Sequence, residues 1–63
     1  MKFSGYLDGE KVTFCLDGMA RLILIHADGS EEPYNEEYYD EDQYTTIRTM
    51  LIRDGITQLT DEE

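Results

Sequence analysis

Four Asp-Gly pairs constrain the fold of this 63-residue chain more than any other feature of its sequence. They lie at residues 8–9, 17–18, 28–29 and 54–55. Asp-Gly between apolar segments is a strong signal for a tight β-hairpin, because a type I′ turn places two successive residues at positive φ. The first three pairs are spaced like the ends of short strands. The sequence therefore predicts an antiparallel β-meander in its N-terminal part.

The first two strands are expected at about residues 2–7 and 10–16. In the second, Val12, Phe14 and Leu16 share one face and polar or small residues occupy the other. This alternation is typical of an antiparallel strand with one face buried and one face in water.

The third strand, expected at about residues 19–27, has a different pattern. Residues 22–25 are an unbroken apolar run, so both faces of this strand are apolar. One face should meet the core. The other needs cover from a helix, a loop or a second chain, and a homodimer through residues 19–26 is one candidate.

The segment Ser30–Asp42 is strongly acidic, with seven Asp or Glu among its thirteen residues. No Lys or Arg occurs between Arg21 and Arg48. Pro33 argues against a central strand here, because proline cannot donate to a β-ladder. We expect an acidic loop.

Residues 40–54 fit a helix or a strand. For a helix, Asp40 is a good N-cap, Gln43 completes a capping-box pattern and Gly55 suits the position after the last turn. For a strand, the high β-propensity of residues 44–47 and the Asp54-Gly55 pair would make a further hairpin. We favour the helix, because its apolar residues fall on one arc whereas strand alternation splits them.

The expected fold class is α+β in one domain, residues 1–63. It comprises the three-stranded meander, the acidic loop and one helix at about residues 40–54. Residues 56–59 can add a short final strand, and residues 60–63 are expected as a frayed tail. A small all-β barrel or sheet is the alternative.

The net charge of -10 restricts the partners of this protein. DNA, RNA and anionic membranes would repel such a surface, so we expect neither direct nucleic-acid binding nor membrane binding. A basic protein surface is the natural partner. Cys15 is the only cysteine, which fits a reducing cytoplasm.

The inventory of reactive residues argues against an enzyme. His26 is the only histidine, and a nucleophile such as Cys15 would need it nearby together with an orienting group. One Cys and one His are too few for a zinc site, and no EF-hand pattern is present, so no cofactor or metal is expected. We place His26 at a strand end near the surface, where the sequence offers no support for pH sensing.

The acidic segment is therefore the candidate binding site. Its carboxylates alternate with tyrosines, which combine large contact area with a low entropy cost. A solvated loop without a binding role is the competing interpretation. The candidate partner-binding residues are Glu31, Glu32, Tyr34, Glu36, Glu37, Tyr38, Tyr39, Asp40, Glu41, Asp42 and Tyr44.

The stretch NEEYYDEDQY at residues 35–44 resembles the small acidic inhibitors encoded by bacteriophages. These include DNA-mimic anti-CRISPR proteins and inhibitors of uracil-DNA glycosylase. The resemblance implies an inhibitor that mimics nucleic-acid charge and occupies a basic, nucleic-acid-binding surface of a host protein or nuclease complex in the host cytoplasm. The alternative function is an interaction or assembly module that associates through the apolar strand face, with the acids serving solubility.

Overall fold

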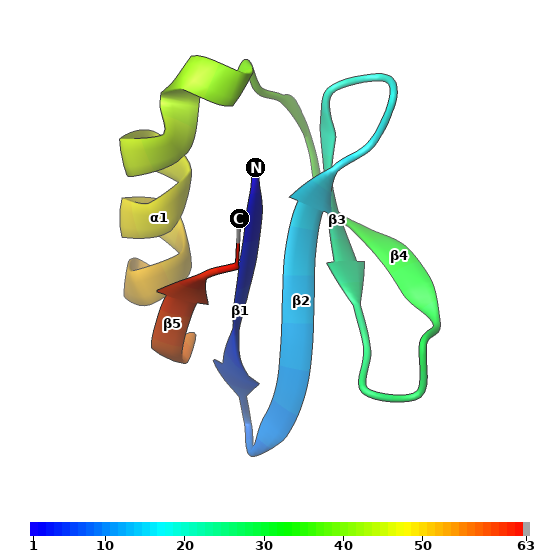
Figure 1. Ribbon diagram of the computed structural model, residues 1–63, viewed down its shortest axis with the longest axis vertical. Coiled ribbons are helices and arrows are strands. Elements are labelled where there is room, and N and C mark those ends of the chain that lie inside the picture. The colour runs from blue at the N-terminus through cyan, green and yellow to red at the C-terminus, as the bar shows by residue number, and fades with distance from the viewer. Residues whose placement is uncertain (63) are drawn as a thin grey trace.

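The computed structural model describes residues 1–62 and contains one five-stranded antiparallel sheet with a single helix (Figure 1). The strands lie side by side in the order β4-β3-β2-β1-β5. Between β4 and β5 the chain forms a short 3₁₀ turn, η1, and the helix α1. The elements are β1 (Lys2–Leu7), β2 (Glu10–Leu16), β3 (Arg21–Ile25), β4 (Glu31–Tyr38), η1 (Glu41–Gln43), α1 (Tyr44–Arg53) and β5 (Thr57–Asp61).

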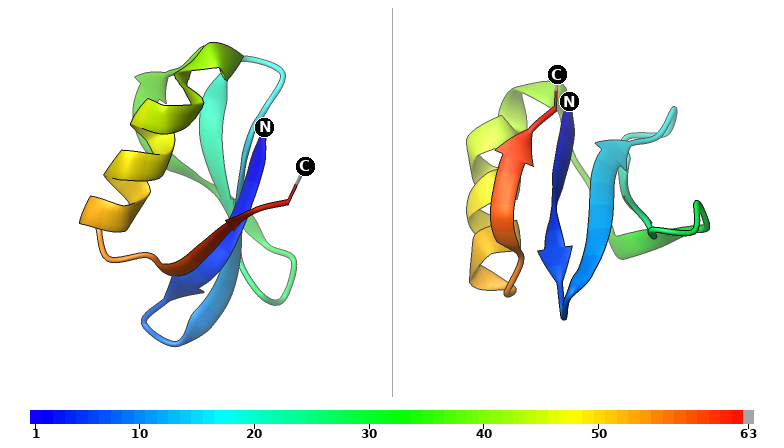
Figure 2. Two further views of the ribbon diagram at one scale, coloured as in Figure 1. Left: turned by 60° about the vertical axis from the view of Figure 1, so that its left-hand side comes forward. Right: turned by 60° about the horizontal axis from the view of Figure 1, so that its bottom comes forward.

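The helix α1 packs on one face of the sheet and closes a small hydrophobic core. Its apolar arc contributes Ile47 and Leu51, which are fully buried. The other buried apolar side chains of this core come from the sheet and from the segments next to α1: Phe3, Val12, Phe14, Leu22, Leu24, Tyr39 and Ile56. The two ends of the described chain lie close together (Figure 2), because β5 returns to pair with β1.

The two predicted hairpins, β1–β2 and β2–β3, are confirmed, and a third hairpin that was not predicted joins β3 to β4; the three turns differ in type. Asp8 and Gly9 have φ values of 52° and 85°, the two positive angles of a type I′ turn. In the second hairpin the positive φ belongs to Ala20, at 65°, while Asp17 accepts backbone hydrogen bonds from two later turn residues. In the third, Gly29 has a φ of 91°.

The predicted helix is confirmed at residues 44–53, but a 3₁₀ turn at residues 41–43 takes the place of its expected first turn. The Asp40 N–H donates to Oε1 of Gln43 at 2.7 Å, as in a capping box. At the other end Gly55 has a φ of 104°, and the Ile56 N–H donates to the Leu51 carbonyl at 3.0 Å. This is the Schellman pattern, in which a glycine in the left-handed region ends the helix.

The structure corrects the expected number of strands from three to five. The largest correction is β4, because the predicted acidic loop is an edge strand. Pro33 is tolerated there, since an edge strand needs ladder hydrogen bonds on one side only. The third strand is shorter than expected at residues 21–25, and the last is longer, because Thr60 pairs with Ser4 instead of fraying. Glu63, the end of the expected tail, lies outside the described residues.

A bulge interrupts β4 halfway along its length. Arg21 pairs with Tyr38, and Ile23 pairs with Pro33, so β4 advances five residues while β3 advances two. Asn35 holds the extra residues, because its Oδ1 accepts the Glu37 N–H at 3.1 Å. Bulges twist an edge strand away from further pairing and re-aim its side chains.

Candidate interaction surface

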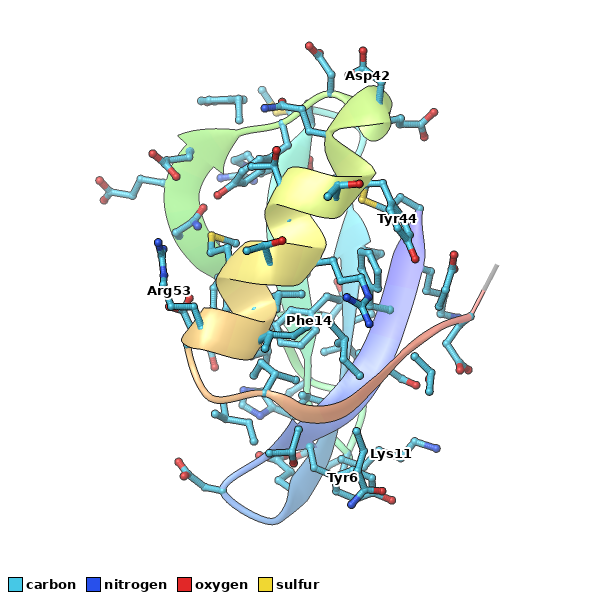
Figure 3. All side chains as sticks on the ribbon, turned by 90° about the vertical axis from the view of Figure 1, so that its left-hand side faces the viewer. Tyr6, Lys11, Phe14, Asp42, Tyr44 and Arg53 are labelled. Carbon is cyan, nitrogen blue, oxygen red and sulfur yellow. The ribbon has the colours of Figure 1, made fainter. Side chains whose placement is uncertain are left out.

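The seven carboxylates of the acidic segment lie on β4, which is the edge strand of the sheet, and on the turn that leads from β4 into the helix. We call this surface the acidic edge: Glu31, Glu32, Glu36 and Glu37 on β4, then Asp40, Glu41 and Asp42 at the start of the helical segment. All seven residues are exposed. Figure 3 shows Asp42 at one end of the helix and Arg53 at the other. The edge therefore runs along β4 and continues to the helix N-terminus.

Three members of the acidic edge also have structural roles. Glu32 binds His26, Glu37 accepts a hydrogen bond from the Tyr39 hydroxyl at 3.0 Å, and Asp40 begins the helical segment. The remaining side chains accept no hydrogen bond and form no ion pair with residues 1–62; these are Glu31, Glu36, Glu41 and Asp42. Their charges are available to a partner.

Among the described residues, the basic side chains are not paired with these carboxylates, although Arg21 lines one groove together with Glu36 and Arg53 lines another together with Glu37. Within residues 1–62, no Lys or Arg forms an ion pair with the acidic edge. Arg21, on the neighbouring strand, is held by Asp17 at 3.3 Å. The others are distributed over β1, β2 and α1: Lys2, Lys11, Arg48 and Arg53. The protein thus leaves most of its acidic edge without an internal cation.

The tyrosines of the candidate site have different environments. Tyr38 is 65% exposed and Tyr44 is 36% exposed, with its ring centroid 5.1 Å from that of Phe3. Tyr39 is only 6% exposed and belongs to the core, where its hydroxyl also accepts a hydrogen bond from Asn35. Sequence reasoning placed this ring at the contact surface, and the structure places it inside.

Tyr34 connects the edge strand to the rest of the fold. Its ring meets Phe14 edge-to-face at 5.3 Å, and its hydroxyl donates to Oδ2 of Asp54 at 2.8 Å. Burial, together with the Asp54 carboxylate, raises the pKa of Tyr34 to about 12. The phenol therefore stays protonated at neutral pH and keeps its hydrogen bond.

Two open grooves flank the acidic edge. One, with a volume of ≈ 550 Å³, lies at the bulge and is lined by Arg21, Pro33, Tyr34, Asn35, Glu36 and Tyr38. The other, of ≈ 440 Å³, lies between the end of β4 and the outer side of α1. Arg21 and Asn35 were not expected at the site from the sequence. Their positions depend on the β3–β4 register, and the bulge that sets this register has no signal in the residue pattern.

The second apolar face of β3 is only partly open. Leu22 and Leu24 face the core under α1, whereas Ile23 and Ile25 lie on the opposite face of the sheet. Ile23 pairs with Cys15 on one side and Pro33 on the other, and is only 8% exposed. Ile25 is half-buried. Ile23 is therefore covered without a second chain, whereas the expected cover was a helix, a loop or a second chain.

Within residues 1–62, no group of three or more His, Cys, Asp or Glu side chains is arranged to hold a metal ion. Across that part of the chain, no helix has the length and apolar character needed to cross a membrane. Comparison with protein-family models, curated proteins and solved structures found no significant match.

Proposed function

We propose that this protein is a small acidic inhibitor, of the kind that phages encode, which binds a basic, nucleic-acid-binding surface of a host protein. The acidic edge makes the contact and mimics nucleic-acid charge. Tyr38 and the groove beside it supply packing at the centre of the contact. The protein acts as a stoichiometric binder in the host cytoplasm and performs no chemistry.

The observation that carries this proposal is an ordered acidic edge with few internal cation partners. A flexible acidic loop would lose conformational freedom on binding, at a cost of about 1–2 kcal/mol for each backbone residue that becomes fixed. In β4, residues 31–33 and 38 already pair with β3, and the Asn35 side chain holds the Glu37 N–H inside the bulge. Binding therefore does not carry the entropy cost of ordering the charged segment.

The spacing of β4 is compatible with a nucleic-acid strand. An extended strand rises by about 3.4 Å per residue, and one DNA strand carries about one phosphate per 3.4 Å of helix axis. Four of the eight residues of β4 are Glu. At that composition an extended strand carries about one carboxylate per 7 Å, which is about half the linear density of phosphates on one DNA strand. A basic cleft that binds phosphates can therefore meet a carboxylate at about every second phosphate position.

The experiment is capture followed by displacement. Nucleic-acid-binding proteins eluted from DNA-cellulose are passed over the immobilised protein, and bound proteins are challenged with duplex DNA and with rising salt. We expect bound proteins to be released by both, because both compete for the same cationic side chains. Capture that duplex DNA does not reverse would contradict the mimicry.

A pair of charge-matched variants locates the contact. E36Q/E41Q removes two charges from the acidic edge, whereas D8N/E62Q removes two charges elsewhere. We expect capture to weaken strongly in the first variant and little in the second. Equal losses in both would mean that net charge, and not the acidic edge, determines binding.

A second candidate function is an assembly module that associates through the apolar face of β3. The half-buried Ile25 and its neighbour Thr13 on β2 favour it, because they lie on the sheet face that α1 does not cover. The near-complete burial of Ile23 limits the apolar area that this face offers a partner.

A further inference from the structure

His26 lies between two carboxylates from different strands. It directly follows β3, and its ring is flanked by Glu10 of β2 and Glu32 of β4. Nδ1 is 3.1 Å from Oε2 of Glu10, and Nε2 forms a short hydrogen bond with Oε2 of Glu32. One imidazole thus connects the strands on both sides of β3.

The carboxylate of Glu10 also holds the turn that follows. Its Oε2 accepts the backbone N–H of Ala27 at 3.1 Å. Asp28, in the same turn, interacts electrostatically with His26 and accepts hydrogen bonds from the backbone N–H and the hydroxyl of Ser30. The charged groups that face the imidazole are therefore all acidic: Glu10 from β2, Asp28 from the turn and Glu32 from β4.

Both ring nitrogens contact an acceptor, and this restricts the protonation state. A neutral imidazole has one N–H and can donate to one carboxylate only, whereas the imidazolium donates to both. In the neutral form, one carboxylate would face a ring nitrogen lone pair. Two hydrogen-bonded carboxylates therefore select the charged ring.

We propose that His26 is a proton-operated clamp that holds the β3–β4 hairpin to β2 and is released when the ring loses its proton. The clamp does not depend on any partner, so it stands apart from the inhibitor function. Its release frees the Glu32 carboxylate and the start of β4. It also changes the formal net charge from -9 (-10 + 1) to -10.

The shifts of the pKa values agree with this geometry. The hydrogen bond to Glu32, followed by that to Glu10, raises the pKa of His26 above its ordinary value of 6.5. The backbone hydrogen bond from Ala27, followed by the bond to His26, lowers the pKa of Glu10 below 4.5.

These directions set the pH window of the clamp. The contribution of His26 to the free energy of unfolding is fully present below pH 6.5, the ordinary pKa of histidine, and is lost as the pH rises through the raised pKa. The contribution of Glu10 to the free energy of unfolding is present above pH 4.5 and is lost as the pH falls through the lowered pKa of Glu10. The contribution of the clamp to stability is therefore complete between about pH 4.5 and 6.5, and the clamp opens as the pH passes the lowered pKa of Glu10 or the raised pKa of His26.

The test is an NMR titration of the His26 ring protons in the full chain and in three variants. E10Q and E32Q each replace one carboxylate that contacts the ring by a neutral amide. E31Q removes the same charge from the residue beside Glu32; Glu31 forms no hydrogen bond or ion pair with His26. We expect a midpoint above pH 6.5 in the parent protein, a downward shift in E10Q and E32Q, and almost no shift in E31Q.

Amide hydrogen exchange between pH 5.5 and 8.5 tests the mechanical part of the proposal. After correction for the intrinsic pH dependence of exchange, protection at Ala27 and residues 31–32 should fall as His26 loses its proton, while protection in β1 stays constant. A parent midpoint at or below 6.5 overturns the clamp, as do equal shifts in all three variants. Titration with unchanged protection in the hairpin overturns it as well.

Discussion

The Tyr34 hydroxyl donates a 2.8 Å hydrogen bond to the Asp54 carboxylate and so joins β4 to the C-terminal end of α1. The two residues are separated by η1 and the whole of α1. Because the Tyr34 ring also packs against Phe14, one side chain anchors the edge strand to both the helix and the core. This anchor makes the acidic edge part of the folded unit.

We expect Tyr34→Phe to lower the free energy of unfolding by about 0.5–1.5 kcal/mol, the usual net value of a hydrogen bond. The ring contact with Phe14 survives this change, so the loss reports the hydroxyl alone. Urea denaturation at pH 7 measures it. Tyr38→Phe is the matched control, because the exposed Tyr38 hydroxyl has no partner among residues 1–62, and it should change stability by less than about 0.5 kcal/mol. Equal losses of stability in the two variants would contradict the anchoring role of the Tyr34 hydroxyl.

Leu51→Ala should destabilise the protein severely, because it removes a fully buried side chain from the core-facing side of the last turn of α1. Such truncations cost about 2–5 kcal/mol. A chain of this size has only about 3–9 kcal/mol in total, at roughly 0.05–0.15 kcal/mol per residue. Thermal unfolding by circular dichroism measures the change. Ile52→Ala, at the adjacent position that is 47% exposed, is the control and should cost far less.

Gly5→Ala tests the close approach of β1 and the segment that begins β5. A Cβ at this position would lie 2.7 Å from Cγ2 of Ile56 and 3.0 Å from the carbonyl oxygen of Thr57. We expect a loss of about 1–3 kcal/mol from overpacking. Gly18→Ala has no neighbour within 4 Å and should leave the urea midpoint nearly unchanged. A Gly5→Ala variant as stable as the parent protein would show that β5 is not held against β1 as described.

The sequence predicted the elements whose signals are local. Asp8-Gly9 carries its own turn geometry, and the two positive φ values appear as expected. The helix was predictable for a similar reason, because Asp40, Gln43 and Gly55 mark its ends independently of the rest of the chain. Both kinds of signal act over a few residues, although Asp17-Gly18 and Asp54-Gly55 adopt other turns than Asp8-Gly9.

Non-local features were not predictable in the same way. Residues 31–38 have the composition of a loop, and only pairing with β3 makes them a strand; their charges are accommodated because one side of an edge strand faces water. Tyr39 was placed at the surface for its amphipathic ring, yet Asn35 and Glu37 satisfy its hydroxyl at the edge of the core. Each of these outcomes depends on the pairing register of β3 and β4, which no short sequence pattern encodes.

Ile25→Lys addresses the assembly alternative. Ile25 is the more accessible of the two isoleucines on the uncovered face of β3. If the acidic edge is the functional surface, the oligomeric state by size-exclusion chromatography should be the same for parent and variant in low and high salt. A salt-resistant oligomer that this substitution dissolves would favour the assembly module.

The most direct measurement of the central claim is the footprint of a partner purified by the capture experiment. Hydrogen exchange or amide chemical shifts of this protein are compared with and without that partner. We expect the protected residues to cluster in β4 and η1, with the strongest effects near Glu36, Tyr38 and Glu41. Protection confined to Thr13, Cys15 and Ile25 on the uncovered sheet face, with the acidic edge unchanged, would contradict the proposal.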